Sequence, residues 1–331
     1  MKDFSYLRAA SAEEASGAAQ QAGAMLLAGG TTLLDLAKCG VTEPDTVVDI
    51  TRLAGLDTIN VGEGGLTIGA LATMSTVADH PEVKAQFPAV AQSLSLAASA
   101  QLRNMATIGG NLLQRTRCAY FRDPQAFPAC NKRAPGSGCS ALGGVTRNHA
   151  VLGTSEKCIA SYPGDLAVAL AAFDAVVDLG TRQVPVDDFL LPYGEAPERE
   201  TLLQPGEIIR GITVPASVAA RQSVYLKVRD RQSYEFAAAS AAVGLEFEAD
   251  GRTVSDIRVA LGGVATKPWR ALAVEQALIG KALDANLVRS ASRLSMEGAV
   301  SHGDNAYKIE LAPRVVARAI LQLAPSLGDL A

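Results

Sequence analysis

Four cysteines within 41 residues are the feature of this sequence best suited to carry chemistry. Cys118, Cys130, Cys139 and Cys158 follow one another in the pattern C-x11-C-x8-C-x18-C. Four thiolates are the usual ligands of a [4Fe-4S] cluster, and soft sulfur ligands also suit zinc. The spacing lacks the paired C-x2-C of zinc ribbons and ferredoxins, so zinc, disulfides and free thiols stay open as alternatives. Cys39 stands apart and is expected to be a small buried hydrophobic residue.

The cysteines lie in a segment, residues 112–160, whose composition differs from the rest of the chain. It holds three prolines and seven Lys or Arg against two acids, and it shows no helical or strand period. A loop of this length in a compact domain is functional or disordered, and metal ligation would offset the entropy of ordering it. The basic excess would favour an anionic cluster, although we expect most of these arginines in a solvated or partner-facing patch. His149 is expected at the surface.

Two glycine pairs have the surroundings of ligand-binding motifs. Gly29-Gly30 follows an apolar run, residues 24–28, and precedes a helical pattern, while Gly109-Gly110 stands in the string Thr107–Asn111. Glycines let a ligand approach the backbone, whose exposed N–H groups favour an anion such as a pyrophosphate. Neither pair belongs to a nicotinamide or P-loop fingerprint, and the G-x-G-x-x-A string at 136–141 lacks the preceding strand that such a site needs.

The elements that must position these motifs follow from capping and periodicity. Ser11 and Glu14 form a capping box, so a helix begins there and runs towards residue 22. We expect strands at 24–28, 47–50, 66–69 and 175–179, and helices across 75–100, interrupted at Pro81 and Pro88, and at 166–172. After about residue 220, strands at 223–229, 240–248 and 254–261 precede helices at 271–281, 285–299 and 308–323. Strands followed by helices predict an α+β domain.

Composition limits the classes of function that the chain can have. Its 331 residues predict about two domains, and 48% hydrophobic with 19% charged residues is typical of a globular protein. The net charge of −4 argues against a nucleic-acid binder, and we expect no membrane span and no signal peptide of its own. The sequence contains three histidines and suggests no Ser–His–Asp set or paired carboxylates. We therefore expect cofactors rather than side chains to carry the chemistry.

Several strings, in order along the chain, resemble one known family. They are Leu26–Leu34 (LLAGGTTLL), Gln101–Asn104 with Thr107–Asn111, Ser161–Asp165 (SYPGD), Gln204–Ile209 and Tyr225–Lys227. Together they resemble the flavin subunit of the molybdenum hydroxylases, a family that includes xanthine dehydrogenase, carbon monoxide dehydrogenase and aldehyde oxidoreductases. The resemblance covers essentially the whole chain.

This resemblance implies a fold, a domain division and an FAD site. The fold would be α+β, with a two-lobed FAD-binding domain of the vanillyl-alcohol oxidase (PCMH) type at 1–220. A C-terminal α+β domain of the carbon monoxide dehydrogenase flavoprotein type would occupy 221–331. The residues implied in FAD binding are Leu26, Leu27, Ala28, Gly29, Gly30, Thr31, Thr32, Leu33, Thr107, Ile108, Gly109, Gly110, Asn111, Asp165, Ile209 and Lys227.

The chain departs from typical members in one place. They run almost directly from the second glycine motif to the flavin-contacting acid, whereas some 53 residues separate Asn111 from Asp165 here. This insertion holds the four clustered cysteines. The arrangement is similar to that of the flavin subunit of periplasmic aldehyde oxidoreductase, which carries an additional [4Fe-4S] cluster. The resemblance thus implies that Cys118, Cys130, Cys139 and Cys158 ligate such a cluster.

The implied function is electron transfer within a molybdenum hydroxylase complex, most naturally an aldehyde oxidoreductase. A large molybdopterin subunit would oxidise the substrate. A small subunit with [2Fe-2S] clusters would pass electrons to FAD here, and FAD would reduce an external acceptor. We expect the complex to assemble in the cytoplasm. The alternative destination is the periplasm, which the folded complex would reach by co-export on a partner's twin-arginine signal. A free-standing flavin oxidase and a metal-stabilised interaction module without redox turnover remain the alternatives.

Overall fold

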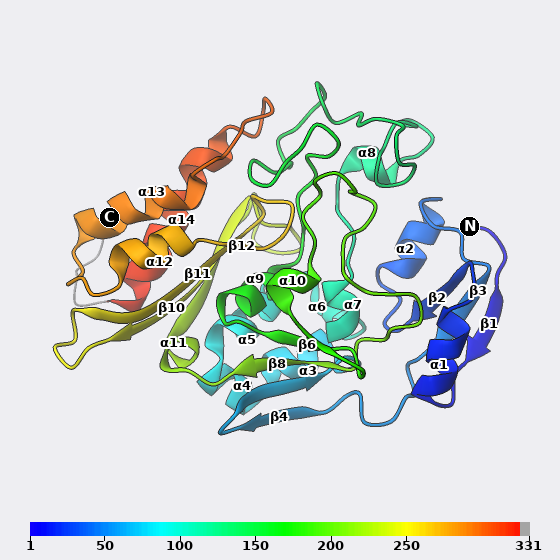
Figure 1. Ribbon diagram of the computed structural model, residues 1–331, viewed down its shortest axis with the longest axis horizontal. Helices are drawn as coiled ribbons and strands as arrows, with labels where there is room; N and C mark the ends of the chain where they lie inside the picture. Colours follow the sequence, from blue (N-terminus) through cyan, green and yellow to red (C-terminus); the bar gives the residue numbers. More distant parts are fainter. Residues whose placement is uncertain (325–331) are drawn as a thin grey trace.

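A small parallel sheet opens the chain in the computed structural model, which describes residues 1–324 (Figure 1). The strand order is β1–β3–β2, with β1 at Ser5–Arg8, β2 at Ala24–Leu27 and β3 at Thr46–Asp49. Ser11 caps helix α1 (Ala12–Ala19) by accepting a hydrogen bond from the Glu14 amide, as the capping box predicts. The first glycine pair lies between β2 and helix α2 (Leu33–Lys38), as expected.

A five-stranded antiparallel sheet forms the middle lobe, in the order β4–β5–β8–β6–β7. Its strands are β4 (Ile59–Gly62), β5 (Gly65–Gly69), β6 (Val176–Asp178), β7 (Gln183–Pro185) and β8 (Gly211–Pro215). Only β5 and β6 were predicted from the sequence, because the other strands are short and show little alternation. Strands from both sides of the insertion belong to this sheet. The ends of the insertion lie close together, since the Tyr162 hydroxyl donates to the Leu112 carbonyl at 3.1 Å.

Helices cover this middle sheet and bury the largest core. They are α3 (Met74–Asp79), α4 (Pro81–Gln86), α5 (Pro88–Ser95), α6 (Ala100–Arg103), α7 (Ile108–Leu112), α9 (Asp165–Ala172) and α10 (Val186–Phe189). Pro81 and Pro88 each occupy the first position of a new helix, where their missing N–H costs nothing. All eight residues of α9 are buried, which makes it the central helix of the core.

The C-terminal part is a four-stranded antiparallel sheet, ordered β12–β11–β10–β9, and helices pack on both of its faces. The strands are β9 (Ser223–Val228), β10 (Ala239–Phe247), β11 (Val254–Gly262) and β12 (Trp269–Arg270); the helices are α11 (Val218–Arg221), α12 (Leu272–Leu278), α13 (Ala285–Arg293) and α14 (Tyr307–Leu323). Helix α14 contacts β10, which α9 also contacts. The α+β fold expected from the sequence is confirmed, whereas the boundary at residue 220 stays a prediction.

The cysteine-containing insertion forms a layer of loops at the top of Figure 1, above α2 and beside the loop that precedes α14. One short helix, α8 (Ala119–Arg122), and isolated bridges such as that between Cys130 and Cys139 are its regular elements within the described chain. The predicted absence of helical or strand period in this segment is therefore confirmed.

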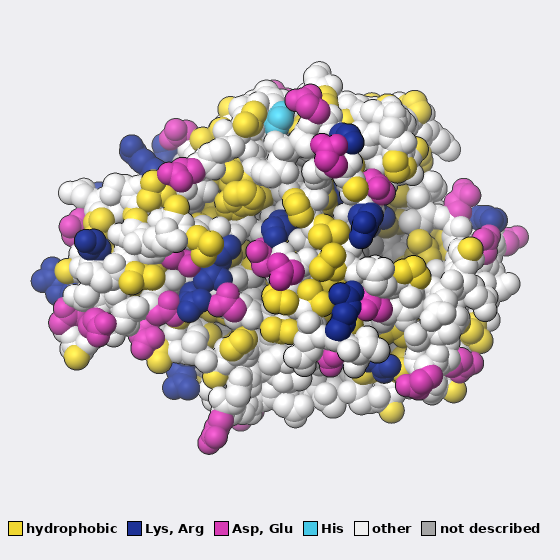
Figure 2. All heavy atoms as spheres, viewed as in Figure 1, with side chains coloured by type: hydrophobic (Ala, Val, Ile, Leu, Met, Phe, Trp, Pro, Cys, Tyr) yellow, Lys and Arg dark blue, Asp and Glu magenta, His cyan; other side chains and the backbone are white. Residues whose placement is uncertain are grey.

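Among the described residues 1–324, no helix is both long and apolar enough to cross a membrane. Figure 2 shows basic and acidic side chains interspersed over one face of the molecule, together with scattered apolar ones. The charges of either sign do not gather into a continuous tract on the described part of this face.

Candidate functional site

The first glycine pair meets the second glycine motif backbone to backbone. A Cβ atom at Gly29 would lie 1.9 Å from the carbonyl oxygen of Met105, so no side chain fits there. Gly30 has a φ of 71°, a conformation that glycine adopts without strain. Both glycines are therefore required by the fold itself, and the two motifs form one continuous surface.

The second glycine motif forms a helical turn, α7, in the structure. Thr107 caps α7 by accepting a hydrogen bond from the Gly110 amide, and the amides of Ile108 and Gly109 donate to the carbonyls of Ala72 and Ala70. A Cβ at Gly109 would press on Ala70, whereas one at Gly110 would meet only the Thr107 hydroxyl, at 3.1 Å. Gly110 thus leaves an open approach to the backbone from outside.

Both motifs offer polar groups without partners in the chain. The amides of residues 29–32 donate to no acceptor among the described residues. The side-chain oxygen of Asn111 is buried and, within the same residues, accepts no hydrogen bond. Buried polar groups are normally paired, so these atoms fit a ligand that carries both acceptors and donors. Such a ligand would match the pyrophosphate and ribityl parts of FAD.

The two charged residues expected beside the flavin are paired with each other. The Lys227 ammonium lies 2.7 Å from the Asp165 carboxylate, and the side chains are 1% and 5% exposed. The Tyr225 hydroxyl donates to the same carboxylate at 2.6 Å, and Lys227 also donates to the Leu96 carbonyl. Burial raises the pKa of Asp165, while the Lys227 ammonium opposes this shift. Ile209, by contrast, lies in the middle core, and a flavin contact there stays a prediction.

A cavity of about 280 Å³ joins the insertion to the rest of the molecule. Its lining includes Cys118 and His149 of the insertion, Ser240 of β10, Gly263 directly after β11, and Asp165 at the start of α9. The cavity thus brings together one of the predicted cluster ligands and one of the predicted flavin contacts, which are 47 residues apart in sequence (165 − 118).

The four clustered cysteines lie within the insertion and form no disulfide among the described residues. Cys130 and Cys139 form a bridge pair, and Cys118 packs against two separate apolar groups, one containing Cys130 and the other containing Cys158. Burial raises the pKa of Cys118 to about 11 and that of Cys158 to about 12, so both are thiols at neutral pH without a metal. Any metal centre here must displace these protons.

The placement of the cysteines bears on the kind of centre that they could hold. In the part of the chain that the structure describes, no three His, Cys, Asp or Glu side chains converge as ligands of one metal ion. Four thiolates are a donor set for a [4Fe-4S] cluster and also for a zinc ion. The donor set of four thiolates fits the cluster.

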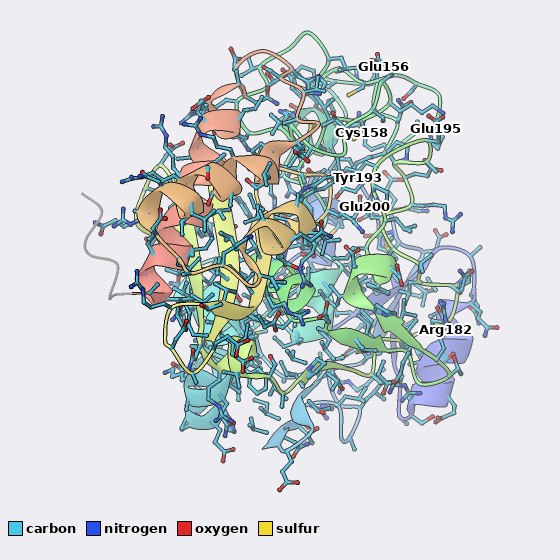
Figure 3. The ribbon with its side chains drawn as sticks, turned by 60° about the vertical axis from the view of Figure 1, so that its left-hand side comes forward. Glu156, Cys158, Arg182, Tyr193, Glu195 and Glu200 are labelled. Carbon is cyan, nitrogen blue, oxygen red and sulfur yellow. The ribbon has the colours of Figure 1, made fainter. Side chains whose placement is uncertain are left out.

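The basic residues of the insertion are mostly paired inside the chain rather than solvated, and the partner-facing alternative stays a prediction. The Lys132 ammonium is 2.8 Å from Glu200 and 3.2 Å from the centre of the Tyr193 ring, and Arg115 also contacts Glu200. Figure 3 shows Cys158, Tyr193 and Glu200 on the side where the insertion meets the segment after α10. Two cations against one carboxylate leave a net positive charge beside Cys158.

Two further arginines tie the insertion to the first glycine motif. Arg117 and Arg122 both contact the carboxylate of Asp35, which lies on α2 directly after that motif. The Arg117 Nε and one terminal nitrogen of Arg122 are buried and have no hydrogen-bond partner among the described residues. Asp35 was not predicted from the sequence, because nothing local marks an acid on a helix as the partner of arginines more than 80 residues away.

Two expectations about single residues were wrong. Cys39 caps the C-terminal end of helix α2 and is exposed, not buried. His149 is 5% exposed rather than at the surface, because the loop before α14 covers it. Its Nε2 lies 3.2 Å from the Cys118 sulfur. Burial, and secondarily the nearby Lys308 charge, lower the pKa of His149 to about 4.

Comparison with known proteins places the whole chain in one family. Residues 2–217 match the model of the FAD binding domain in molybdopterin dehydrogenase, and residues 224–323 match the CO dehydrogenase flavoprotein C-terminal domain. The chain belongs to the FAD-binding medium subunits of the molybdenum hydroxylases, and it is an oxidoreductase subunit of that type.

Particular relatives narrow this further. The chain is 43% identical to the aldehyde oxidoreductase FAD-binding subunit PaoB of Escherichia coli, over 97% of this chain and 98% of that protein. It is 30% identical to the glyceraldehyde dehydrogenase medium chain of Sulfolobus acidocaldarius, over 89% and 88% of the two chains. A carbon monoxide dehydrogenase structure from Hydrogenophaga pseudoflava superposes with a TM-score of 0.74 at 28% identity, covering 98% of each chain.

Proposed function

We propose that this protein is an FAD- and [4Fe-4S]-containing electron-transfer subunit of an aldehyde-oxidising molybdenum hydroxylase complex. Electrons would arrive from [2Fe-2S] clusters of a small partner, after substrate oxidation on a large molybdopterin partner, and leave through FAD to an external acceptor. The observation that carries the proposal is the shared cavity, which is lined by both Cys118 and Asp165. The names of the relatives, two of which act on aldehydes, support the substrate class.

The chain's own residues would hold FAD without supplying acid–base chemistry. The unpartnered amides of residues 29–32 and the open backbone at Gly110 would receive the pyrophosphate, and the buried Asn111 oxygen would accept a hydrogen bond from the cofactor. The buried Asp165–Lys227 pair would hold a carboxylate and an ammonium group in fixed positions at one side of the cavity. When bound, FAD supplies the exchange of one or two electrons.

The insertion would hold the cluster through Cys118, Cys130, Cys139 and Cys158. A cluster with four thiolate ligands is an anion, and the net positive charge of the network around Lys132 would stabilise it in a buried site. The irregular backbone of this segment would gain its order from the four ligand bonds. When bound, the cluster supplies one-electron exchange.

A first experiment tests the FAD site at Gly110. Gly110→Val places a side chain on the open approach to the backbone, so we expect the purified protein to lose FAD. Gly110→Ala should still fold, because its Cβ requires the Thr107 hydroxyl, at 3.1 Å, to shift only slightly, and it should retain less FAD than the wild type. Gly17→Ala, at a helix position with nothing within 4 Å, is the control and should retain FAD fully. Full occupancy in Gly110→Val would exclude this turn as the phosphate cradle.

A second experiment tests the cluster. Each Cys→Ser change at the four positions should lower iron together with inorganic sulfide, because a hard hydroxyl replaces a soft thiolate. Cys39→Ser is the matched control, since Cys39 is exposed and lies outside the insertion, and it should leave both contents unchanged. The wild type should contain about four iron and four sulfide per chain. One zinc without sulfide would replace the cluster with a structural metal site.

The absorption spectrum separates the proposal from its two alternatives. Flavin bands with a broad iron–sulfur absorption support it. Flavin bands alone, with turnover of substrate by the isolated chain, would indicate a free-standing flavin oxidase. Neither absorption, with metal still bound, would indicate an interaction module. Copurification of the chain with a molybdopterin subunit and a [2Fe-2S] subunit would support the proposed complex.

A further inference from the structure

His149 is the residue of the insertion whose contacts the FAD and cluster sites leave unexplained. Its side chain is buried, its Nε2 lies 3.2 Å from the Cys118 sulfur, and it lines the same cavity as that cysteine. Its Nδ1 is buried and, among the described residues, has no hydrogen-bond partner. A ring held in this way at a sulfur atom suggests more than packing, since buried polar atoms are rarely left unpaired without a reason.

The chemistry of a ligating thiolate fixes the direction of this hydrogen bond. A thiolate bound to iron carries no hydrogen, so only the imidazole can donate, and Nε2 must then bear the proton. The backbone around His149 holds the ring in place. The His149 amide donates to the Thr146 carbonyl at 2.8 Å, and the buried Asn305 of the C-terminal domain donates to the next carbonyl, that of Ala150, at 2.9 Å.

The geometry points to His149 as a positioning residue for the cluster, donating an N–H···S hydrogen bond to Cys118 and holding that ligand against the cavity wall. This inference rests on the proposed cluster. Hydrogen bonds to the sulfurs help to set the reduction potential of an iron–sulfur cluster. A donor stabilises the reduced state more, because that state carries one more negative charge, so the bond should raise the potential.

The ring of His149 also packs against that of Tyr120, with 6.0 Å between the ring centres, and this contact does not account for the polar Nε2. Among the described residues, the polar contact of the His149 Nε2 is the one with the Cys118 sulfur.

The test compares His149→Phe with His149→Gln. Phenylalanine keeps a ring of similar size without a donor, whereas glutamine keeps an N–H group. We expect His149→Phe to retain iron and sulfide and to shift the cluster's midpoint potential downwards, in a redox titration followed by electron paramagnetic resonance. His149→Gln should recover part of that shift. His302→Phe is the matched control, because His302 lies at the same interface but its Nε2 pairs with the Thr154 hydroxyl, and it should leave the potential unchanged.

Each outcome decides a separate question. An unchanged potential in His149→Phe, with full iron and sulfide, would overturn the positioning role. Loss of iron and sulfide from both His149 variants, with native circular dichroism, would make His149 a ligand and overturn it as well. Absence of iron and sulfide from the wild type would instead overturn the proposed cluster, so the two failures are distinguishable.

Discussion

Replacing Lys227 with methionine tests the buried charge pair that lines the start of α9. Methionine keeps the length and apolar character of the lysine stem but removes the ammonium group. Asp165 would then be buried with the Tyr225 hydroxyl and without its cation. If the pair stabilises the protein as its geometry indicates, this single change should markedly lower the free energy of unfolding.

The magnitude follows from the depth of the pair. Its atoms are 2.7 Å apart and its side chains are 1% and 5% exposed. Removing one partner of a buried ion pair costs about 3–5 kcal/mol, because an uncompensated charge is left in the interior. For a domain of this size that corresponds to a fall in melting temperature on the order of 10 °C.

The cost should depend on pH in a definite direction. Burial raises the pKa of Asp165 in the folded protein, and Lys227 is the largest influence opposing that rise. In Lys227→Met the folded-state pKa rises further above the unfolded value of about 3.9. The folded variant therefore binds more protons than the unfolded chain between these two pKa values, and its stability increases as the pH falls through that window. The deficit relative to wild type should be largest at neutral pH.

Thermal and urea unfolding of the apoprotein at several pH values between 5 and 8 would measure these effects without interference from flavin binding. Lys84→Met is the control, because Lys84 and Asp79 form a pair at 2.9 Å whose side chains are 53% and 76% exposed, and solvent screens such a pair so that it contributes little to stability. The double variant Asp165→Asn/Lys227→Met should recover much of the loss. A cost no greater than that of Lys84→Met, or a deficit that does not shrink in acid, would refute the reasoning.

Three further changes test contacts around the two cofactor sites. Gly29→Ala forces a Cβ against the Met105 carbonyl and should destabilise the protein by about 1–3 kcal/mol or more, measured by urea unfolding; an unchanged midpoint would contradict the backbone contact. Lys132→Met should lower the free energy of unfolding by about 1–3 kcal/mol, less than the loss of an isolated buried ion pair, because Arg115 still contacts Glu200. Lys132→Arg should lower it less in the same assay. Asn305→Ala should leave buried groups of the insertion unpaired, at a similar cost of about 1–3 kcal/mol, and should speed proteolysis of residues 112–160; equal cleavage rates would exclude it as an anchor.

The sequence predicted those parts of the site that local chemistry determines. The strand–glycine–helix order around Gly29 and Gly30, the cap at Ser11 and the helix starts at Pro81 and Pro88 depend on neighbouring residues, and the structure confirms them. The irregular insertion was recognisable because its composition forms no amphipathic period. The short strands β4, β7 and β12 could not be predicted, since pairing with distant strands stabilises them rather than their own propensity.

What the sequence could not predict are the partners of the polar groups. Asp165 and Lys227 were each expected to face the flavin, and only the fold shows that they neutralise each other across 62 residues. The exposure of Cys39 and the burial of His149 likewise depend on which segments cover them, not on their neighbours in the chain. Long-range packing, rather than local pattern, decides these properties.

The contacts of the insertion connect its folding to the folding of the segments around the first glycine motif. On one side, Arg117 and Arg122 bind Asp35, one helical turn after the first glycine motif. On the other, the buried Asn305 holds the backbone beside His149. The insertion therefore bridges the N-terminal lobe and the C-terminal domain. A change at one of the cysteines would disturb Asp35 through Arg117 and Arg122, which lie close to Cys118 in the chain. A cysteine variant can therefore lose flavin although the cysteine does not contact flavin. The iron and sulfide contents are the direct measure of whether a cysteine ligates the cluster.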